Sequence, residues 1–191
     1  MSKKVLIAYG TRYGSTEEIS QEIAKMLEKE GIESQVVNLG KTKPKNWPSI
    51  DEFDGVLVGS GIKVTRWVKH PKTFLQKHKD DIKTKGKILG IFISSGFAAS
   101  PEKQPEAKKL FIEDLLEKFN IEADIYDAFG GIFDFSESSK MGFIDKKALQ
   151  LAAKGMSEDF GLEYDPDGRN DFRDWDQIRS FTEKFAALLK S

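Results

Sequence analysis

Residues Val5-Leu6-Ile7-Ala8-Tyr9-Gly10-Thr11-Arg12-Tyr13-Gly14-Ser15-Thr16 form the stretch that decides the fold. Its apolar start predicts a buried strand, and the polar residues that follow predict a tight loop. Apolar side chains then recur at Ile19, Ile23 and Leu27 with the spacing of a helix. A strand, a short loop and a helix start predict an anion site, because backbone N–H groups and the positive end of the helix dipole converge there.

The composition of the loop favours a phosphate as that anion. Thr11, Ser15 and Thr16 supply hydroxyl donors, and Gly10 and Gly14 let the backbone approach a ligand closely. No lysine ends the loop, so it lacks the GxxxxGK[ST] pattern of a P-loop. The stretch therefore predicts a phosphate site that is built from hydroxyl and amide groups.

A purely structural interpretation of the same loop competes with this one. Ser15 and Glu18, three residues apart, predict a capping box for the following helix. A cap requires neither Thr11 nor Thr16, and their presence favours phosphate binding.

Composition limits the remaining possibilities. The 191 residues predict one domain, and 30 basic against 31 acidic residues argue against nucleic acid as the main partner. The absence of cysteine excludes thiol catalysis, disulfides and cysteine-ligated iron–sulfur centres. No signal peptide is predicted at the start, and no apolar run approaches the roughly 20 residues of a membrane span. We therefore expect a cytoplasmic protein.

The rest of the chain alternates strands with helices. After the first strand, further strands are predicted at 32–39, 54–61, 88–93 and 124–135, the last interrupted by two glycines. Helices are predicted after Gly14, at Pro71, from about Ala107 with Leu110 facing inward, at 144–156, and after a cap at Asp174. This alternation predicts a doubly wound α/β fold with a five-stranded parallel sheet in the order 2-1-3-4-5. Residues 136–173 form an insertion after the fifth strand in the single domain 1–191.

Loop chemistry separates the doubly wound classes. A nicotinamide-binding domain needs GxGxxG and an acid after the second strand, where this chain has Asn38. A phosphate-accepting receiver domain needs acidic residues where this chain has Tyr9-Gly10 and Gly59-Ser60. A low-molecular-weight phosphatase needs a cysteine, which is absent.

The chain resembles the flavodoxin family in three loops. The family's first loop reads [ST]-x-[TSY]-G-x-[TS] and wraps the phosphate of FMN, and Thr11 to Thr16 match it. The resemblance implies FMN as cofactor, no metal, and no catalytic side chain, because the flavin carries the redox chemistry. The cofactor-binding residues that it implies are Thr11, Arg12, Tyr13, Gly14, Ser15 and Thr16; Ser60, Gly61, Ile62, Lys63 and Trp67; and Ser94, Ser95, Gly96 and Phe97.

Several of these residues have two possible roles. Arg12 either faces outward or adds a positive charge at the phosphate. Trp67 and Phe97 either stack on the flavin or pack beneath their own loops, and Lys63 either reaches the flavin edge or is solvated.

His70 and His78 lack a metal-spaced partner and are interpreted as structural. The acidic run at 165–171 lacks the downstream glutamate of a calcium loop and is interpreted as a solvated turn.

A narrower resemblance concerns the branch of the family that contains menaquinone-dependent protoporphyrinogen oxidase. Similar segments are Gly59 to Lys63, Pro101 to Lys103, Phe129 to Gly131, and Asp174-Trp175. The insertion departs from that branch, because its lysines are mixed with acids and large aromatic residues are few.

Three functions follow from these resemblances. The first is a flavodoxin-type electron carrier that shuttles electrons between low-potential redox proteins. The alternative is a flavin-dependent oxidoreductase of the protoporphyrinogen oxidase type, and the third is a binding module that has lost its cofactor. The nearly neutral net charge is unusual for a flavodoxin carrier, and the hydroxyl-rich loop argues against the third function.

Overall fold

The computed structural model describes residues 2–63, 65–137, 139 and 142–191. The strands are β1 (Lys4–Gly10), β2 (Glu33–Asn38), β3 (Gly55–Lys63), β4 (Arg66–Trp67), β5 (Ile88–Ser94), β6 (Ile125–Phe129), β7 (Ile132–Asp134) and β8 (Arg169–Asp171). The helices are α1 (Ser15–Lys29), α2 (Lys69–Thr84), α3 (Gln104–Lys108), α4 (Asp114–Phe119), α5 (Phe143–Phe160) and α6 (Trp175–Lys190). A π-helix, Lys109–Glu113, joins α3 to α4.

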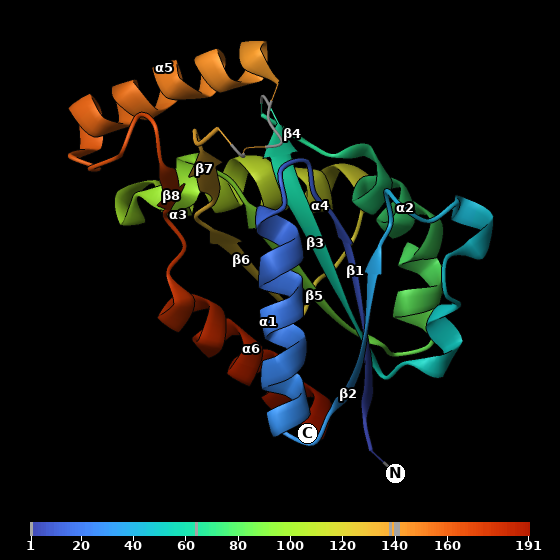
Figure 1. Ribbon diagram of the computed structural model, residues 1–191. Coiled ribbons are helices and arrows are strands. Elements are labelled where there is room, and N and C mark those ends of the chain that lie inside the picture. Colours follow the sequence, from blue (N-terminus) through green and yellow to red (C-terminus); the bar gives the residue numbers. More distant parts are fainter. Residues whose placement is uncertain (1, 64, 138, 140–141) are drawn as a thin grey trace.

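The main sheet has the predicted doubly wound order. Its parallel strands run β2-β1-β3-β5-β6, which confirms the order 2-1-3-4-5 and the edge position of the second strand. Helices α1 and α6 cover one face, and α2 and α4 lie across the other (Figure 1). The switch in strand order falls between β1 and β3, whose carboxyl ends therefore define the expected ligand crevice.

Burial on both faces explains why the central strands show no alternation of polar and apolar residues. In β1, Val5 and Ile7 pack with α1 and α6, whereas Leu6 and Ala8 belong to the core on the opposite face. All four side chains are fully buried. A parallel strand that is covered by helices on both sides needs apolar residues at every position.

Two predicted segments are built differently from the expectation. The loop after the third strand is a hairpin, in which β3 continues to Lys63 and pairs with β4 in antiparallel fashion. The predicted fifth strand, 124–135, is two strands: β6 completes the main sheet, and β7 pairs with β8 in a separate ribbon. The break falls at Gly130, where the carbonyl of Phe172 occupies the space that a side chain would need.

The inner face predicted for the helix after Ala107 is correct at Phe111, Leu115 and Phe119, which belong to the core or pack against it, and wrong at Leu110. Leu110, expected to face inward, is 49% exposed, whereas Ile112 is fully buried. Leu110 lies in the π-helix, and a π-turn adds a residue to the helical turn. A regular 3.6-residue pattern makes no allowance for that extra residue.

The insertion forms a small layer over the carboxyl edge of the sheet. Phe133, Phe135 and Ala153 make a separate buried cluster between β7 and α5. Helix α5 crosses above the ends of the central strands (Figure 1). In the described part of the chain, no helix combines the length and hydropathy needed to cross a membrane.

His78 has a structural position in α2. Its side chain is buried, and its ring lies 4.6 Å from that of Phe74. Burial lowers the pKa of His78, which favours the neutral ring. No group of three or more potential metal ligands occurs among the residues that the structure describes.

Gly130 should be intolerant of any side chain. A Cβ atom there would lie 1.9 Å from the Phe172 carbonyl oxygen, which is fixed backbone. We expect Gly130→Ala to lower the free energy of unfolding by about 1–3 kcal/mol, the usual cost of overpacking. Chemical denaturation measures this change.

Gly155→Ala is the matched control, because Gly155 lies inside α5 with nothing within 4 Å of an added Cβ. Alanine should stabilise that helix by about 0.5–1 kcal/mol through its higher helix propensity. Equal effects of the two substitutions would contradict the described packing at Gly130.

Candidate cofactor site

The loop after β1 reaches α1 through a left-handed residue. Gly14 has a φ of 102° and occupies the N-cap position, and its N–H donates to the Thr11 hydroxyl at 3.0 Å. The predicted capping box is wrong, because the helix begins at Ser15 and no side chain caps it. The first amides of α1 have no acceptor within the helix and point toward the loop. They remain suited to an anion.

Ser15 connects the first loop to the end of β5 instead of capping the helix. Its hydroxyl lies 2.8 Å from the Ser94 hydroxyl, and Ser94 donates to the carbonyl of Gly130 at 3.1 Å. These bonds join the ends of β1, β5 and β6 at one edge of the sheet. Two of the three predicted loops are thereby held in contact.

The buried hydroxyl of Thr16 is the clearest indication of a ligand at this site. The residue is 1% exposed, and its hydroxyl has no hydrogen-bond partner among the residues that the structure describes. That hydroxyl faces Gly61, since a Cβ added to Gly61 would lie 3.3 Å from it. A buried hydroxyl without a partner carries an unfavourable desolvation cost that a ligand oxygen can offset.

A cavity of about 80 Å³ lies among these loops. It is small beside the roughly 300–1,000 Å³ typical of ligand pockets. Its lining residues are Thr11, Arg12, Tyr13, Ser15, Thr16, Gly61, Ile62, Ser94, Ser95, Gly96, Gly131, Ile132, Phe133 and Leu149. The structure thus brings together members of all three predicted loops.

Five residues of the predicted set do not line this cavity: Gly14, Ser60, Lys63, Trp67 and Phe97. Ser60 is fully buried, with its hydroxyl bonded to the carbonyl of Gly61 at 3.0 Å. Trp67 donates its indole N–H to the Phe111 carbonyl at 2.6 Å, and Phe97 packs edge-on against the Phe111 ring. Lys63 is exposed at the end of β3.

Arg12 is bound to the insertion. Its Nη2 lies 2.6 Å from the Asp145 carboxylate in the first turn of α5, and its Nε donates to the Tyr13 hydroxyl at 2.6 Å. Hydrogen bonds from Arg12 and then Tyr13 hold the pKa of Asp145 below its usual value. This ion pair joins the first loop to the helix that crosses the cavity, and we call it the latch.

The acids in the first turn of α1 are also paired. Glu18 contacts Arg169 and Arg173 of the insertion, each at 2.9 Å. Glu17 lies 3.5 Å from Lys41, and burial followed by the Glu17 interaction raises the pKa of Tyr9 to about 12. These pairs reduce the repulsion that Glu17 and Glu18 would exert on an anion at the helix start.

Sequence reasoning missed four lining residues: Gly131, Ile132, Phe133 and Leu149. The first three follow β6, so the interruption at Gly130-Gly131 was a usable signal of a fourth loop. Leu149 comes from α5, and no local pattern indicates which face of that helix turns toward the cavity. The Phe133 ring also fills the space that a side chain at residue 96 would need.

The fold and this edge of the sheet define a doubly wound protein with an anion loop at the topological switch point. The flavodoxin domain family matches residues 6–160, which is most of the chain. The chain therefore belongs to the flavodoxin family, and its cofactor is FMN.

Three similar proteins illustrate this membership. Protoporphyrinogen IX dehydrogenase [quinone] of Escherichia coli K12 is 25% identical over 186 residues, covering 97% of this chain and 96% of that protein. A flavodoxin of Streptococcus pneumoniae TIGR4 has a TM-score of 0.52 at 14% identity and covers 98% of this chain and 97% of its own. Rubredoxin oxygen:oxidoreductase of Desulfovibrio gigas has a TM-score of 0.58 at 17% identity over 98% of this chain, which spans only 36% of that protein.

The residues present fit an FMN phosphate. The unpartnered Thr16 hydroxyl, the Thr11 and Ser15 hydroxyls and the first amides of α1 are all donors suited to phosphate oxygens. The ring system would meet the apolar part of the lining, where Ile62, Phe133 and Leu149 lie.

Replacing Thr16 with valine tests the unpartnered hydroxyl, because valine keeps the shape of the side chain. Removing one hydrogen bond to a charged phosphate should weaken FMN binding by roughly 10- to 100-fold. The FMN-free protein should keep or gain stability, since the hydroxyl has no partner there. Fluorescence titration with FMN and thermal unfolding measure the two effects.

Thr182→Val is the control, because the buried Thr182 hydroxyl bonds to the Ile178 carbonyl at 2.8 Å within α6. It should leave FMN affinity unchanged. Unchanged affinity in Thr16→Val as well would place the phosphate elsewhere.

Asp145→Asn should loosen the latch. The uncharged amide weakens the pairing with Arg12, so α5 opens more often, and FMN should bind and dissociate roughly two- to fivefold faster. Stopped-flow flavin fluorescence measures both rates. Glu158→Gln, which removes the Lys154 pair elsewhere on α5, should change neither rate. Slower FMN release in Asp145→Asn would instead indicate that the freed Arg12 binds the phosphate.

Proposed function

We propose that this protein is an FMN-containing electron carrier that exchanges electrons with low-potential redox proteins. One observation carries the proposal. Among the described residues that line the cavity, Arg12 and Tyr13 are the only ionisable side chains, and both interact with Asp145. The part of the lining that the structure describes offers no carboxylate or imidazole to accept a substrate proton.

This lining favours a carrier over a dehydrogenase. An enzyme that removes hydrogen from a substrate moves protons together with electrons, usually with a positioned acid or base. A carrier needs only to hold its cofactor and let electrons pass. FMN supplies one- and two-electron transfer when bound, and this chain supplies hydroxyls, amides and an apolar wall.

The proposal includes the three-loop binding set predicted from the sequence and a cytoplasmic location. Thr11, Ser15 and Thr16 would hold the phosphate. Gly61 and Ile62 of β3, and Ser94 to Gly96 after β5, would lie along the ring system. Trp67 and Phe97 would act through packing, since both contact Phe111 instead of the cavity.

A second candidate is an FMN-dependent oxidoreductase of the protoporphyrinogen IX dehydrogenase type. The match to that relative extends over 97% of this chain and therefore includes the insertion. Leu149 of the insertion and Phe133 also give the cavity an apolar wall that an apolar substrate could contact.

One pair of measurements on the FMN-loaded protein separates the two candidates. Anaerobic reductive titration followed by absorbance should show two separate one-electron steps if the protein is a carrier. Incubation with protoporphyrinogen IX and menaquinone should then give no porphyrin fluorescence above the rate without protein. Multiple turnovers in that assay would overturn the carrier function in favour of the enzyme.

A further inference from the structure

A second, larger hollow lies on the other side of the β3–β4 hairpin. It has a volume of about 740 Å³ and runs between β4, the start of α2, and the π-helix with α4. We call it the hairpin groove. Its lining residues are Thr65, Arg66, Trp67, Lys69, Lys72, Thr73, Leu110, Phe111, Asp114, Leu115, Lys118 and Phe119.

The charge of the hairpin groove is strongly one-sided. Arg66, Lys69, Lys72 and Lys118 are all exposed, and none of them forms an ion pair within the described part of the chain. Asp114 is the one acid among the described lining residues, and it lies 3.1 Å from Lys109 outside the groove. Four cations thus gather on a protein whose net charge is only −1.

Apolar groups lie among these cations. Leu110, near the start of the π-helix, is 49% exposed at the groove. The rings of Trp67, Phe111 and Phe119 also contribute, and Lys72 lies 5.6 Å from the centre of the Phe119 ring. The indole bond from Trp67 to the Phe111 carbonyl ties the two sides of the groove together. Mixed apolar and basic surfaces of this kind favour ligands with acidic and apolar groups together.

The hairpin groove shares a wall with the cofactor cavity. Ile62 lines the cavity, Trp67 lines the groove, and the two are cross-strand partners in the hairpin. The N–H of Val68 donates to the Gly61 carbonyl at 3.2 Å, which closes the same short ladder. A molecule seated in the groove would therefore lie one strand pair away from the cofactor.

We propose that the hairpin groove docks an acidic, partly apolar segment of a protein that exchanges electrons with this one. The proposal rests on the proposed carrier function. Four cations that form no ion pair with any described residue surround an apolar floor and complement such a segment, and their field would raise the rate of encounter. The hollow shape suits an inserted segment better than a flat surface such as a membrane.

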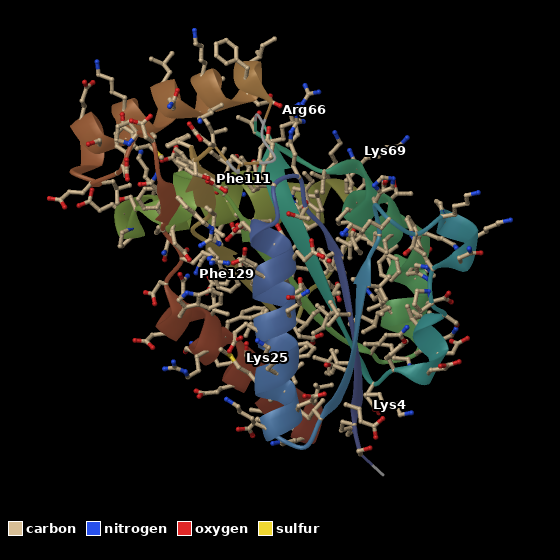
Figure 2. The ribbon with its side chains drawn as sticks, in the orientation of Figure 1. Lys4, Lys25, Arg66, Lys69, Phe111 and Phe129 are labelled. Atoms are coloured by element: carbon tan, nitrogen blue, oxygen red, sulfur yellow. The ribbon has the colours of Figure 1, made fainter. Side chains whose placement is uncertain are left out.

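Arg66 and Lys69 lie near the hairpin, whereas Lys4 and Lys25 lie toward the opposite end of the molecule (Figure 2). This separation allows charge reversal to be tested locally. Arg66→Glu, Lys69→Glu and Lys72→Glu together alter the groove, and Lys25→Glu, Lys29→Glu and Lys184→Glu together make the same charge change on exposed parts of α1 and α6.

The binding experiment uses FMN-loaded protein and a peptide in which glutamate alternates with leucine, followed by amide chemical shifts. We expect shifts concentrated at Arg66, Trp67, Leu110 and Phe111, and at least about tenfold weaker binding in the groove variant. The α1–α6 control variant should bind like the unaltered protein. A peptide in which glutamate alternates with serine should bind more weakly, because it lacks apolar groups.

Three outcomes would overturn the proposal: equal loss of binding in both variants, shifts outside the groove, or no binding of the glutamate–leucine peptide. Preferential binding to phosphatidylglycerol vesicles through the groove would also overturn the proposal, because the binding partner would then be a membrane and not a protein segment.

A kinetic experiment separates this proposal from the carrier function. Reduced, FMN-loaded protein is mixed at low salt with anionic ferricyanide or cationic hexaammineruthenium(III). The basic groove should make oxidation by ferricyanide fast relative to oxidation by hexaammineruthenium(III). Charge reversal in the groove should lower the ratio of the ferricyanide rate to the hexaammineruthenium(III) rate by about tenfold or more. A ratio that is unchanged in the groove variant would overturn the docking proposal while leaving the carrier function intact. Failure of the protein to exchange electrons at all would sink the carrier function without altering the peptide result.

Discussion

Close packing at Gly10 is the constraint on which the rest of the site depends. A Cβ atom at this position would lie 2.7 Å from side-chain atoms of both Val68 and Pro71. The end of β1 is therefore pressed against the start of α2, and only glycine permits this contact. Because Val68 follows the β3–β4 hairpin directly, the contact fixes the hairpin relative to the anion loop. The close contact of the Gly10 backbone with Val68 and Pro71 therefore positions both the first and the second loop, and a larger residue at position 10 could not make it.

Charge pairing then determines how the insertion lies over that edge. Arg12 of the first loop binds Asp145 of the insertion. Glu18, in the first turn of α1, binds Arg169 and Arg173 of the insertion. Arg173 is almost fully buried, whereas the Glu18 side chain is 47% exposed and those of Arg12 and Asp145 are 34% and 36% exposed. The insertion is therefore held over the site at two points: Arg173 anchors its base, and the latch holds the start of α5.

The fold was predictable because its signals are local and redundant. Uninterrupted apolar strands, glycine-rich turns and helical spacing all indicate the same doubly wound sheet, and the three loops at its carboxyl edge follow from strand order. What could not be predicted depends on tertiary contacts. Leu110 is exposed near the start of a π-helix, and the contact of Leu149 with the cavity required the insertion to fold back. Trp67 and Phe97 have aromatic side chains suited to either role, and only the folded structure shows that both contact Phe111.

The cofactor cavity and the hairpin groove differ in volume, and the insertion lies on the side of the smaller one. The insertion contributes Leu149 and supports Phe133 on one side of the hairpin, and there the cavity is narrow. Among the described residues, none from the insertion lines the hollow on the other side, where Leu110 is exposed and the four cations have no acidic partner. A cofactor covered on the insertion side would be approached most directly through the hairpin. Ile62 and Trp67, which are cross-strand partners in the hairpin, form a wall that the cofactor cavity and the basic groove share.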